Sequence, residues 1–287
     1  MRVCIVGAGL IGGSLGLALR AHSDIEHVIG LGRRAEPLQR GVAMGALDDW
    51  QLEPDVALAE VDVIVLGVPL GAMAPVLRWI APHRPKNAII TDVGSAKGCV
   101  VEDAIAVWGE LPPQFVPAHP IAGTEHSGID AAVADLFVNR RVILTPTPET
   151  AELASDTVTR LWTMAGASVV RMSVDEHDRM LAMTSHLPHM LAFGLVDLLA
   201  GASDRDEMLR YAAGGFRDFT RIASSDPVMW RDICLGNRTA LLEALGAYRG
   251  DLETLSEAVA SADGEALEAI FSRAKQTRDA YRHWFET

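Results

Sequence analysis

The sequence has little that would tie it to an oxidising compartment or to a membrane. Its 287 residues include only three cysteines, Cys4, Cys99 and Cys234, which are widely spaced and form no CxxC pair. This pattern excludes a disulfide framework, and we expect a reducing, cytoplasmic setting. No run of eighteen apolar residues occurs, which excludes a membrane-spanning helix. The N-terminus lacks the basic and apolar regions of a signal peptide.

Basic residues are also scarce. Lys and Arg number 25 against 38 Asp and Glu, so the formal net charge is −13. A chain of this charge repels phosphate backbones and anionic lipid, and we expect neither nucleic acid nor membrane as a partner. A local group of arginines or backbone N–H groups still binds a small anion. Hydrophobic residues make up 49% and charged residues 22%, which is typical of a globular protein with one large domain or two modest ones.

The first part of the chain alternates short apolar runs with amphipathic stretches. This alternation is typical of βαβ units around a covered parallel sheet, so residues 1–172 are predicted to form a doubly wound, Rossmann-type α/β domain. The expected strands are residues 2–6, 28–31, 61–68, 88–92, 115–118, 142–145 and 168–172. The expected helices are residues 15–21, 38–44, 72–80, 98–108 and 151–164.

Strand patterns disappear in the rest of the chain, residues 173–287. Helical periodicity covers residues 174–200, 206–211, 228–248, 252–261 and 264–285, which predicts a second, all-helical domain. The first of these segments is apolar on too many sides for one exposed helix face. We therefore expect it to be buried in a bundle or against a second copy of the chain, forming a homodimer through this half.

A glycine-rich motif stands between the first expected strand and the first expected helix. It reads Gly7-Ala-Gly9-Leu10-Ile11-Gly12, the GxGxxG spacing of a dinucleotide-binding turn. Gly7 would allow the tight turn, Gly9 would admit a pyrophosphate to the backbone, and Gly12 would let helix and strand pack closely. A glycine-rich turn that binds nothing is the alternative, and the strand and helix on either side favour dinucleotide binding.

The choice of nicotinamide cofactor is predicted from the residues about 20 positions beyond this motif. Gly32 stands there without a carboxylate, and Arg33 and Arg34 follow it. Two guanidinium groups can grip a 2′-phosphate and no acid repels it, so NADP is favoured over NAD, which stays possible. The alternative is that both arginines are solvated or stack on adenine without discriminating.

Three loops leave the carboxyl edge of the predicted sheet with unusual chemistry. They carry Pro69, Ser95 and His119, and loops at this edge converge on one crevice. His119 directly after a strand is a candidate general base, and Ser95 could hydrogen-bond one imidazole nitrogen and fix its tautomer. For Lys97 we favour a plain role at the start of a helix, with its ammonium in water.

Five segments together resemble the prephenate and arogenate dehydrogenase family of tyrosine biosynthesis. They are Gly7–Gly16, Asp92–Gly98, His119–Gly128, Ser185–His189 and Gly214–Trp230, which span nearly the whole chain in order. The resemblance implies a nicotinamide-binding domain, a helical dimerisation domain and an active site in the cleft between them. It also implies an oxidative decarboxylation of a cyclohexadienol, in which hydride passes to the nicotinamide and the ring loses carbon dioxide.

The resemblance also assigns residues to roles. His119 is the base for the C4 hydroxyl proton, with Ser95 assisting its orientation and contacting the nicotinamide and the substrate. Arg221 matches the arginine that clamps a substrate carboxylate. The pocket is completed by His189, by Thr124 and Glu125 of the His119 motif, and by Trp230, which matches a residue that reaches across from the partner subunit.

Each of these assignments has a plainer alternative. Arg221 and its neighbour Arg217 could pair with Asp218 and Asp226, Trp230 could be core, and Glu125 could be a solvated cap. The HxxH pair of His186 and His189 invites a zinc site, but no third ligand stands at metal spacing, so no metal is expected.

Two rival functions are less favoured. A non-catalytic nucleotide-sensing module would not need Ser95, His119 and Arg221 together. Another β-hydroxy-acid dehydrogenase would rely on a lysine in the helical half, where Lys275 is a poor candidate. Many relatives carry an acid where this chain has Gly32, so the family does not decide between NAD and NADP. Nor does the sequence decide between prephenate and arogenate.

Overall fold

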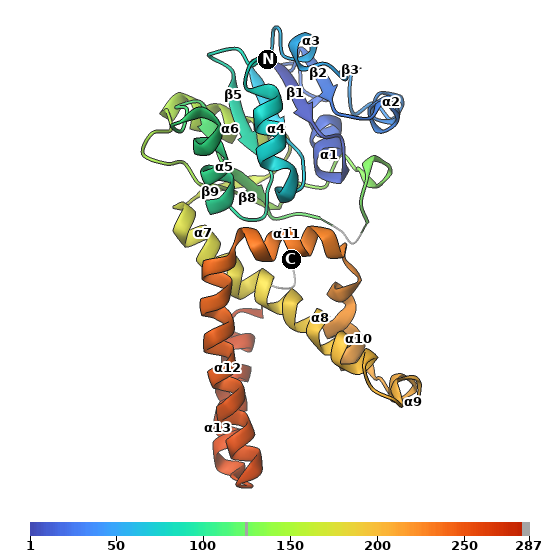
Figure 1. Ribbon diagram of the computed structural model, residues 1–287, viewed down its shortest axis with the longest axis vertical. Coiled ribbons are helices and arrows are strands. Elements are labelled where there is room, and N and C mark those ends of the chain that lie inside the picture. The colour runs from blue at the N-terminus through green and yellow to red at the C-terminus, as the bar shows by residue number, and fades with distance from the viewer. Residues whose placement is uncertain (124–125, 283–287) are drawn as a thin grey trace. The chain divides into compact units, whose positions relative to one another are not determined.

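The computed structural model describes residues 1–123 and 126–282. A six-stranded parallel sheet, in the order β3-β2-β1-β4-β5-β6, forms the N-terminal part (Figure 1). This is the strand order of the doubly wound dinucleotide-binding fold, and it confirms the predicted fold class. The strands are β1 (Arg2–Val6), β2 (His27–Leu31), β3 (Asp49–Gln51), β4 (Val63–Leu66), β5 (Ile89–Asp92) and β6 (Phe115–Val116). The short edge strand β3 was not expected.

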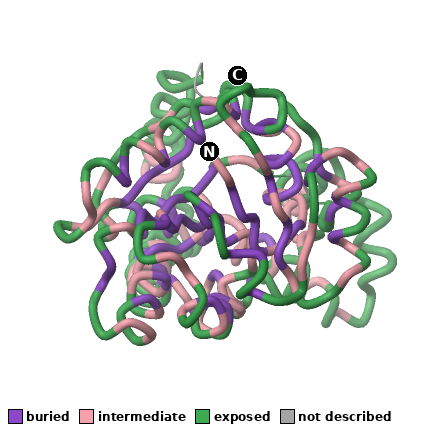
Figure 2. The backbone as a smooth tube through the Cα atoms, turned by 90° about the horizontal axis from the view of Figure 1, so that it is seen from above, coloured by how far each residue is buried: buried purple, intermediate pink, exposed green. Residues whose placement is uncertain are grey.

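Helices cover both faces of this sheet. They are α1 (Leu10–Leu19), α2 (Ala35–Ala43), α3 (Pro54–Ala57), α4 (Met73–Ile80), α5 (Gly98–Trp108) and α6 (Glu152–Met164), with short 3₁₀ turns η1 (Leu70–Ala72) and η2 (Ile129–Ala131). Alternate residues of a strand point to opposite faces. Val3 and Ile5 of β1 therefore enter the core under α1 and α6, and Cys4 and Val6 enter the core under α4 and α5. In Figure 2 the buried stretches of the chain are purple and the exposed turns around them are green.

The last three strands form a separate sheet, which corrects the sequence prediction. They are β7 (Ala118–Pro120), β8 (Arg141–Leu144) and β9 (Ser168–Arg171). β7 runs antiparallel to β8, and β8 runs parallel to β9. Residues 115–118, expected to be one strand, divide at Pro117, which has no N–H for a ladder. His119 consequently lies within β7 and pairs with Ile143, rather than following a strand.

Helices make up the remainder of the described chain. They are α7 (Val174–Leu181), the π-helical turn η3 (Ala182–His186), α8 (Leu187–Ala200), α9 (Arg205–Arg210), α10 (Gly214–Thr220), the 3₁₀ turn η4 (Arg221–Ser224), α11 (Pro227–Gly236), α12 (Arg238–Ala260) and α13 (Gly264–Ala280). The expected helix over residues 228–248 is divided near Asn237, and α12 runs on through the expected break near residue 250. The expected extension of the last helix beyond residue 282 lies outside the described residues.

The chain packs as two compact units. Met1–Ala240 form the first and Leu241–Thr287 the second, so the division falls inside α12. In the first unit, α11 lies between α8 and the η1 turn that follows β4 (Figure 1). The expected boundary between residues 172 and 173, in the loop between β9 and α7, stays a prediction. No helix in the part of the chain that the structure describes is long and apolar enough to cross a bilayer.

Candidate active site

The glycine motif forms the turn between β1 and α1. Gly7 has φ +96°, and a Cβ there would lie 2.6 Å from the carbonyl oxygen of Gly67. A Cβ on Gly12 would lie 2.4 Å from the carbonyl of Gly7. Gly9 differs, because a Cβ there would meet no atom within 4 Å. Two glycines therefore close the turn and one borders open space at a helix N-terminus, as a pyrophosphate requires.

A groove of about 1180 Å³ opens beside this turn. Six of the predicted cofactor residues line it: Gly7, Gly9, Gly32, Arg33, Arg34 and Pro69. Leu10, Ile11 and Gly12 are the first residues of α1 and are not among its lining residues. Arg33 and Arg34 are exposed and form no ion pair among the described residues. The residues present therefore fit a nicotinamide dinucleotide.

A third arginine, missed from the sequence, lines the same groove. Arg40 of α2 is joined to Asp130 of η2, with 2.5 Å between Nε and Oδ1. Ile129 of η2 fills the space left by the missing side chain of Gly13, where a Cβ would lie 2.3 Å from its Cδ1. The segment that follows the His119 loop is thus packed on α1 at the rim of the groove.

A buried ion pair holds the backbone beside His119. Lys97 donates its ammonium to Asp92 and, at 2.7 Å, to the carbonyl of Ala118. Asp92 in turn accepts the N–H of Ala118 at 3.1 Å. The expectation that the Lys97 ammonium lies in water is wrong, because its side chain is 0% exposed and its charge is neutralised in the interior.

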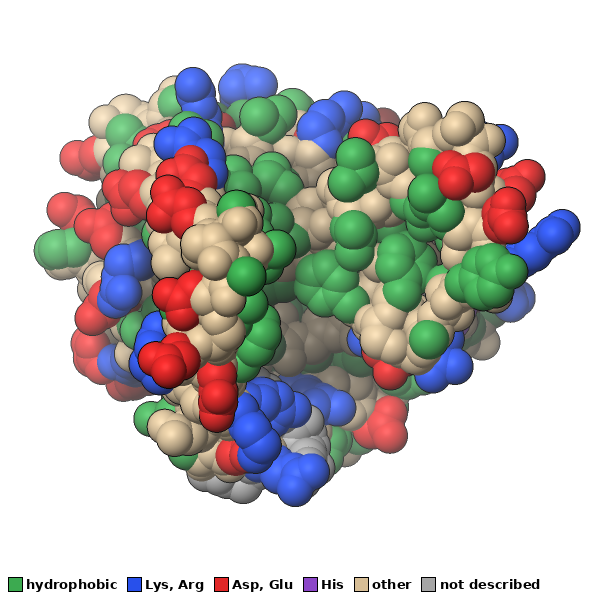
Figure 3. Space-filling model, turned by 90° about the horizontal axis from the view of Figure 1, so that it is seen from below, with side chains coloured by type: hydrophobic (Ala, Val, Ile, Leu, Met, Phe, Trp, Pro, Cys, Tyr) green, Lys and Arg blue, Asp and Glu red, His purple; other side chains and the backbone are tan. Residues whose placement is uncertain are grey.

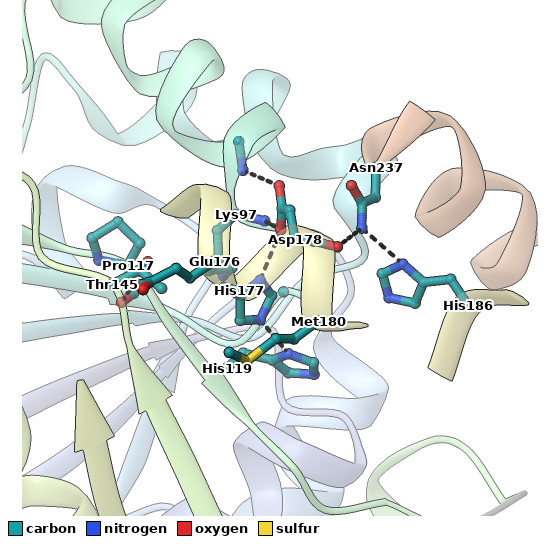
Figure 4. Close-up of polar contacts among 12 residues, drawn as sticks. Lys97, Pro117, His119, Thr145, Glu176, His177, Asp178, Met180, His186 and Asn237 are labelled. Carbon is teal, nitrogen blue, oxygen red and sulfur yellow. Dashed lines mark hydrogen bonds and ion pairs between the residues drawn. The ribbon is translucent and has the colours of Figure 1, made fainter. Parts of the chain in front are cut away.

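His119 is linked to a second histidine that the sequence interpretation did not use. Its Nδ1 lies 2.8 Å from Nε2 of His177, and Nδ1 of His177 lies 2.7 Å from Oδ1 of Asp178 (Figure 4). Asp178 also accepts the backbone N–H groups of Lys97 and Gly98, both at 2.8 Å. The carboxylate therefore closes the N-terminus of α5 and anchors the histidine pair.

Burial sets the charge of this group. It lowers the pKa of His119 well below 6.5, and His177, Lys97 and His186 lower it further. Burial also lowers the pKa of His177, although Asp178 opposes the shift. Burial raises the pKa of Asp178, but hydrogen bonds from His177, Gly98 and Lys97 outweigh it and the net pKa is lowered. At neutral pH both imidazoles are therefore neutral beside an ionised carboxylate.

His186 lies at the end of the π-helical turn. Its Nδ1 accepts from Asn237 at 3.0 Å, and the same amide group donates to the carbonyl of Asp178 at 2.7 Å. Burial lowers the pKa of His186 to about 4, against a partial rise from the nearby charge of Asp178. Nε2 is buried without a hydrogen-bond partner in the described chain. Single π-helical turns are frequent at functional sites.

Three predicted substrate residues come together on α8, η4 and α11. The rings of His189 and Trp230 stack at 3.6 Å between centroids, 19° from parallel. His189 donates its Nδ1 hydrogen to the carbonyl of Ser185 at 2.9 Å, and its pKa is lowered by burial and by nearby Arg221. Arg217 pairs with Asp218, whereas Arg221 has no carboxylate partner among the described residues. The guanidinium of Arg221 is thus free for a ligand.

Other predicted residues take different places. Ser95 is half-buried in the loop before α5, and its hydroxyl makes no hydrogen bond to a described residue. Its expected role in orienting His119 stays a prediction. Trp230, matched to a residue reaching across from a partner, packs on His186 and His189 of its own chain. Thr124 and Glu125 lie outside the described residues.

One sequence signal could have pointed to the missed pair. Ser173 and Glu176 form a reciprocal capping box at the start of α7, the [ST]xx[DE] pattern of a helix N-terminus. That pattern places His177 and Asp178 next to a fixed helix start. Only the tertiary structure, however, brings them to His119.

The arrangement supports acid–base chemistry in the same domain as the dinucleotide groove. A neutral imidazole is available at His119, and the loops after β4 and β5 touch, since a Cβ on Gly94 would lie 2.7 Å from Leu70. Pro69, the neighbour of Leu70, lines the dinucleotide groove. A cation at Arg221 lies near His189 for an acidic ligand.

Comparison with known families agrees with this description. Residues 15–171 match the family model described as prephenate dehydrogenase, nucleotide-binding domain. Residues 173–273 match the model described as prephenate dehydrogenase, dimerization domain.

Individual relatives extend over nearly the whole chain. A cyclohexadienyl dehydrogenase of Zymomonas mobilis is 38% identical over 98% of this chain and 96% of its own length. A prephenate dehydrogenase of Bacillus subtilis is 35% identical over 96% of this chain and 75% of its own. The crystal structure of prephenate dehydrogenase from A. aeolicus, in complex with hydroxyphenyl propionate and NAD+, has a TM-score of 0.89, 34% identity and 98% coverage of both chains. Synechocystis arogenate dehydrogenase has a TM-score of 0.84 and 30% identity, covering 98% of this chain and all of that one.

Proposed function

The chain belongs to the prephenate dehydrogenase family, and from that premise we propose that it oxidises prephenate to 4-hydroxyphenylpyruvate, with arogenate as the alternative substrate. It is a nicotinamide-dependent oxidoreductase acting in tyrosine biosynthesis. Two relatives keep the alternative open, since one is named cyclohexadienyl dehydrogenase and the other arogenate dehydrogenase.

His119 is the proposed base of the reaction. When bound, the nicotinamide accepts the hydride that leaves C4 of the cyclohexadienol ring. A neutral imidazole near the C4 hydroxyl takes its proton as the hydride departs, and the ring becomes aromatic when the C1 carboxyl leaves as carbon dioxide. Because the pKa of His119 is lowered, the imidazole is ready to accept that proton at neutral pH.

The remaining predicted residues are proposed to bind the substrate. Arg221, exposed and without a carboxylate partner among the described residues, suits a bidentate clamp on a substrate carboxylate. His189 and Trp230 form a stacked wall beside it. Ser95, half-buried in the loop before α5, keeps its proposed contact with nicotinamide and substrate. Thr124 and Glu125 stay candidates from the sequence alone.

For the cofactor we propose NADP over NAD. Arg33, Arg34 and Arg40 line the groove, against the two acids Glu36 and Asp130. Asp130 is already paired with Arg40, which leaves Arg33 and Arg34 for a 2′-phosphate. The related A. aeolicus enzyme was crystallised with NAD+, so the cofactor ratio has to be measured.

A homodimer through the helical half completes the proposal. Large hydrophobic side chains are exposed on α8 to α10, namely Leu195, Leu198, Met208, Leu209 and Phe219. Hydrophobic side chains gather on part of the face seen from below, beside charged ones (Figure 3). An apolar surface of this kind typically marks a protein interface, and the matched family model is named a dimerization domain.

The observation that carries the proposal is His119 itself. Its imidazole is buried and neutral, and it is held by a hydrogen bond to His177. The test supplies prephenate and arogenate separately, each with NAD and with NADP, and follows the reduced cofactor by its absorbance. We expect the highest rate with prephenate and NADP. Faster turnover of arogenate would favour the alternative substrate, and no turnover in any of the four mixtures would reject the proposed function.

A further inference from the structure

The contacts around Asp178 determine where the protons of the histidine pair lie. The carboxylate is ionised, since its pKa is lowered, and an ionised carboxylate only accepts hydrogen bonds. It accepts the N–H groups of Lys97 and Gly98, and its Oδ1 lies 2.7 Å from Nδ1 of His177. Nδ1 of His177 must therefore carry the hydrogen. In a neutral imidazole the other nitrogen, Nε2, is then an acceptor.

The same reasoning extends to His119. Its Nδ1 lies 2.8 Å from that acceptor, so Nδ1 of His119 must carry a hydrogen and donate it. Nε2 of His119 is left with its lone pair, and it makes no hydrogen bond to a described residue. Figure 4 shows the three side chains in this order, with His177 between Asp178 and His119. The lone pair that can accept a proton from a substrate is therefore the one on Nε2 of His119.

We propose that His177 is the positioning residue of this enzyme, and that with Asp178 it fixes the tautomer and the orientation of the imidazole of His119. The proposal rests on the proposed function, in which His119 is the base. His177 does not touch the substrate in this scheme and acts only through His119. In this proposal, His177 and Asp178 have the orienting role that the sequence analysis suggested for Ser95.

The pair also bears on the charged form of the base. When His119 takes a proton, its neighbours His177, Lys97 and His186 all oppose the new charge. The carboxylate joined to His119 through His177 is that of Asp178, and we infer that it compensates part of the imidazolium charge. Removal of His177 should therefore move the acid limb of the pH profile as well as the rate.

The test has to separate positioning of His119 from a purely structural role of the pair, because Asp178 also accepts backbone N–H groups at the N-terminus of α5. For that reason the variants are made at His177. His177→Phe keeps a planar ring but removes the acceptor. His177→Gln keeps an amide oxygen that can accept from His119. His83→Gln, at an exposed histidine outside the site, is the matched control.

The experiment combines nitrogen NMR with kinetics on the full chain. Histidine labelled with ¹⁵N reports which ring nitrogen is protonated. In the wild type at neutral pH, His119 should have a protonated Nδ1 and an unprotonated Nε2. His177→Phe should lose this single tautomer and lower kcat by about 10²-fold, with a smaller change in KM and a shifted acid limb. His177→Gln should recover most of the rate, and His83→Gln should match the wild type.

Two results would overturn the proposal. One is a wild-type His119 protonated at Nε2. The other is a folded His177→Phe variant, checked by its thermal melt, that keeps the wild-type kcat and pH profile. The tautomer is measured without substrate. A wild type with the expected tautomer that oxidises neither prephenate nor arogenate would therefore reject the proposed function, and not the positioning of His119.

Discussion

The ammonium of Lys97 lies 2.5 Å from the carboxylate of Asp92, and neither side chain is exposed to solvent. Both charges contact the backbone of Ala118, the residue before His119. The pair therefore connects the loop after β5 to the short strand that carries the proposed base.

Removal of the lysine should be strongly destabilising. Lys97→Met leaves the Asp92 carboxylate buried and unpaired, which typically costs about 3–5 kcal/mol. The matched control is Lys275→Met, because Lys275 and Asp279 form a surface pair 77% and 55% exposed, and such pairs contribute about 0–1 kcal/mol. Urea unfolding measures both. Equal losses of unfolding free energy from the two variants would show that the buried pair is no more important for stability than the surface pair.

Arg221 should act on substrate binding. Arg221→Ala removes the only cation proposed for a substrate carboxylate, and loss of a hydrogen bond to a charged group is worth about 1.5–3 kcal/mol. We expect KM for prephenate to rise about 10- to 100-fold, with a smaller change in kcat. Arg217→Ala, at an arginine already paired with Asp218, should change KM little. An unchanged KM for Arg221→Ala would remove this residue from the substrate site.

A single carboxylate should change the cofactor preference. A Cβ on Gly32 would lie 3.5 Å from Leu38 Cδ1, an ordinary contact, so Gly32→Asp fits the backbone. The new charge would repel a 2′-phosphate and should shift the ratio of kcat/KM towards NAD by about 10- to 100-fold. Gly264→Asp, which adds the same charge where a Cβ meets no atom within 4 Å, is the control. A constant ratio would show that the Gly32 loop does not contact the phosphate.

Stability should fall on mild acidification. The pKa values of His119, His177, His186 and His189 are all lowered in the folded protein. Below pH 6.5 these histidines bind protons in the unfolded chain but stay unprotonated in the native state. The free energy of unfolding therefore decreases as the pH falls.

For His186 the stability is lost between pH 6.5 and about pH 4, the pKa values of the unfolded and folded states. This difference corresponds to roughly 3 kcal/mol of unfolding free energy. Urea unfolding between pH 7.5 and 4.5 measures the slope, and His186→Gln should make it shallower. A stability that is flat over this range would mean that these imidazoles titrate normally.

The fold was predictable where local pattern decides it. The strand, the glycine turn and the helix around Gly7 follow from sequence spacing, and so does the doubly wound sheet. The switch to a second sheet at Pro117 could not be predicted from local pattern, because the pairing of β7 with β8 depends on which strand is near in space.

The site was predictable in part for the same reason. Motifs pointed to His119, Arg221 and His189 as candidates, but the hydrogen-bond partner of His119 lies 58 residues further along the chain. No local pattern joins His119 to His177. Lys97 was misjudged for a similar reason, since burial of an ammonium depends on a carboxylate and a carbonyl supplied by other strands.

The role of His119 as the base is measured most directly by the turnover of His119→Asn with prephenate, compared with the wild type. The affinity of the variant for the nicotinamide cofactor is measured alongside. We expect kcat to fall by about 10²–10⁴-fold, with an unchanged dissociation constant of the cofactor. A variant that binds cofactor normally and turns over at the wild-type rate would show that His119 is not the base.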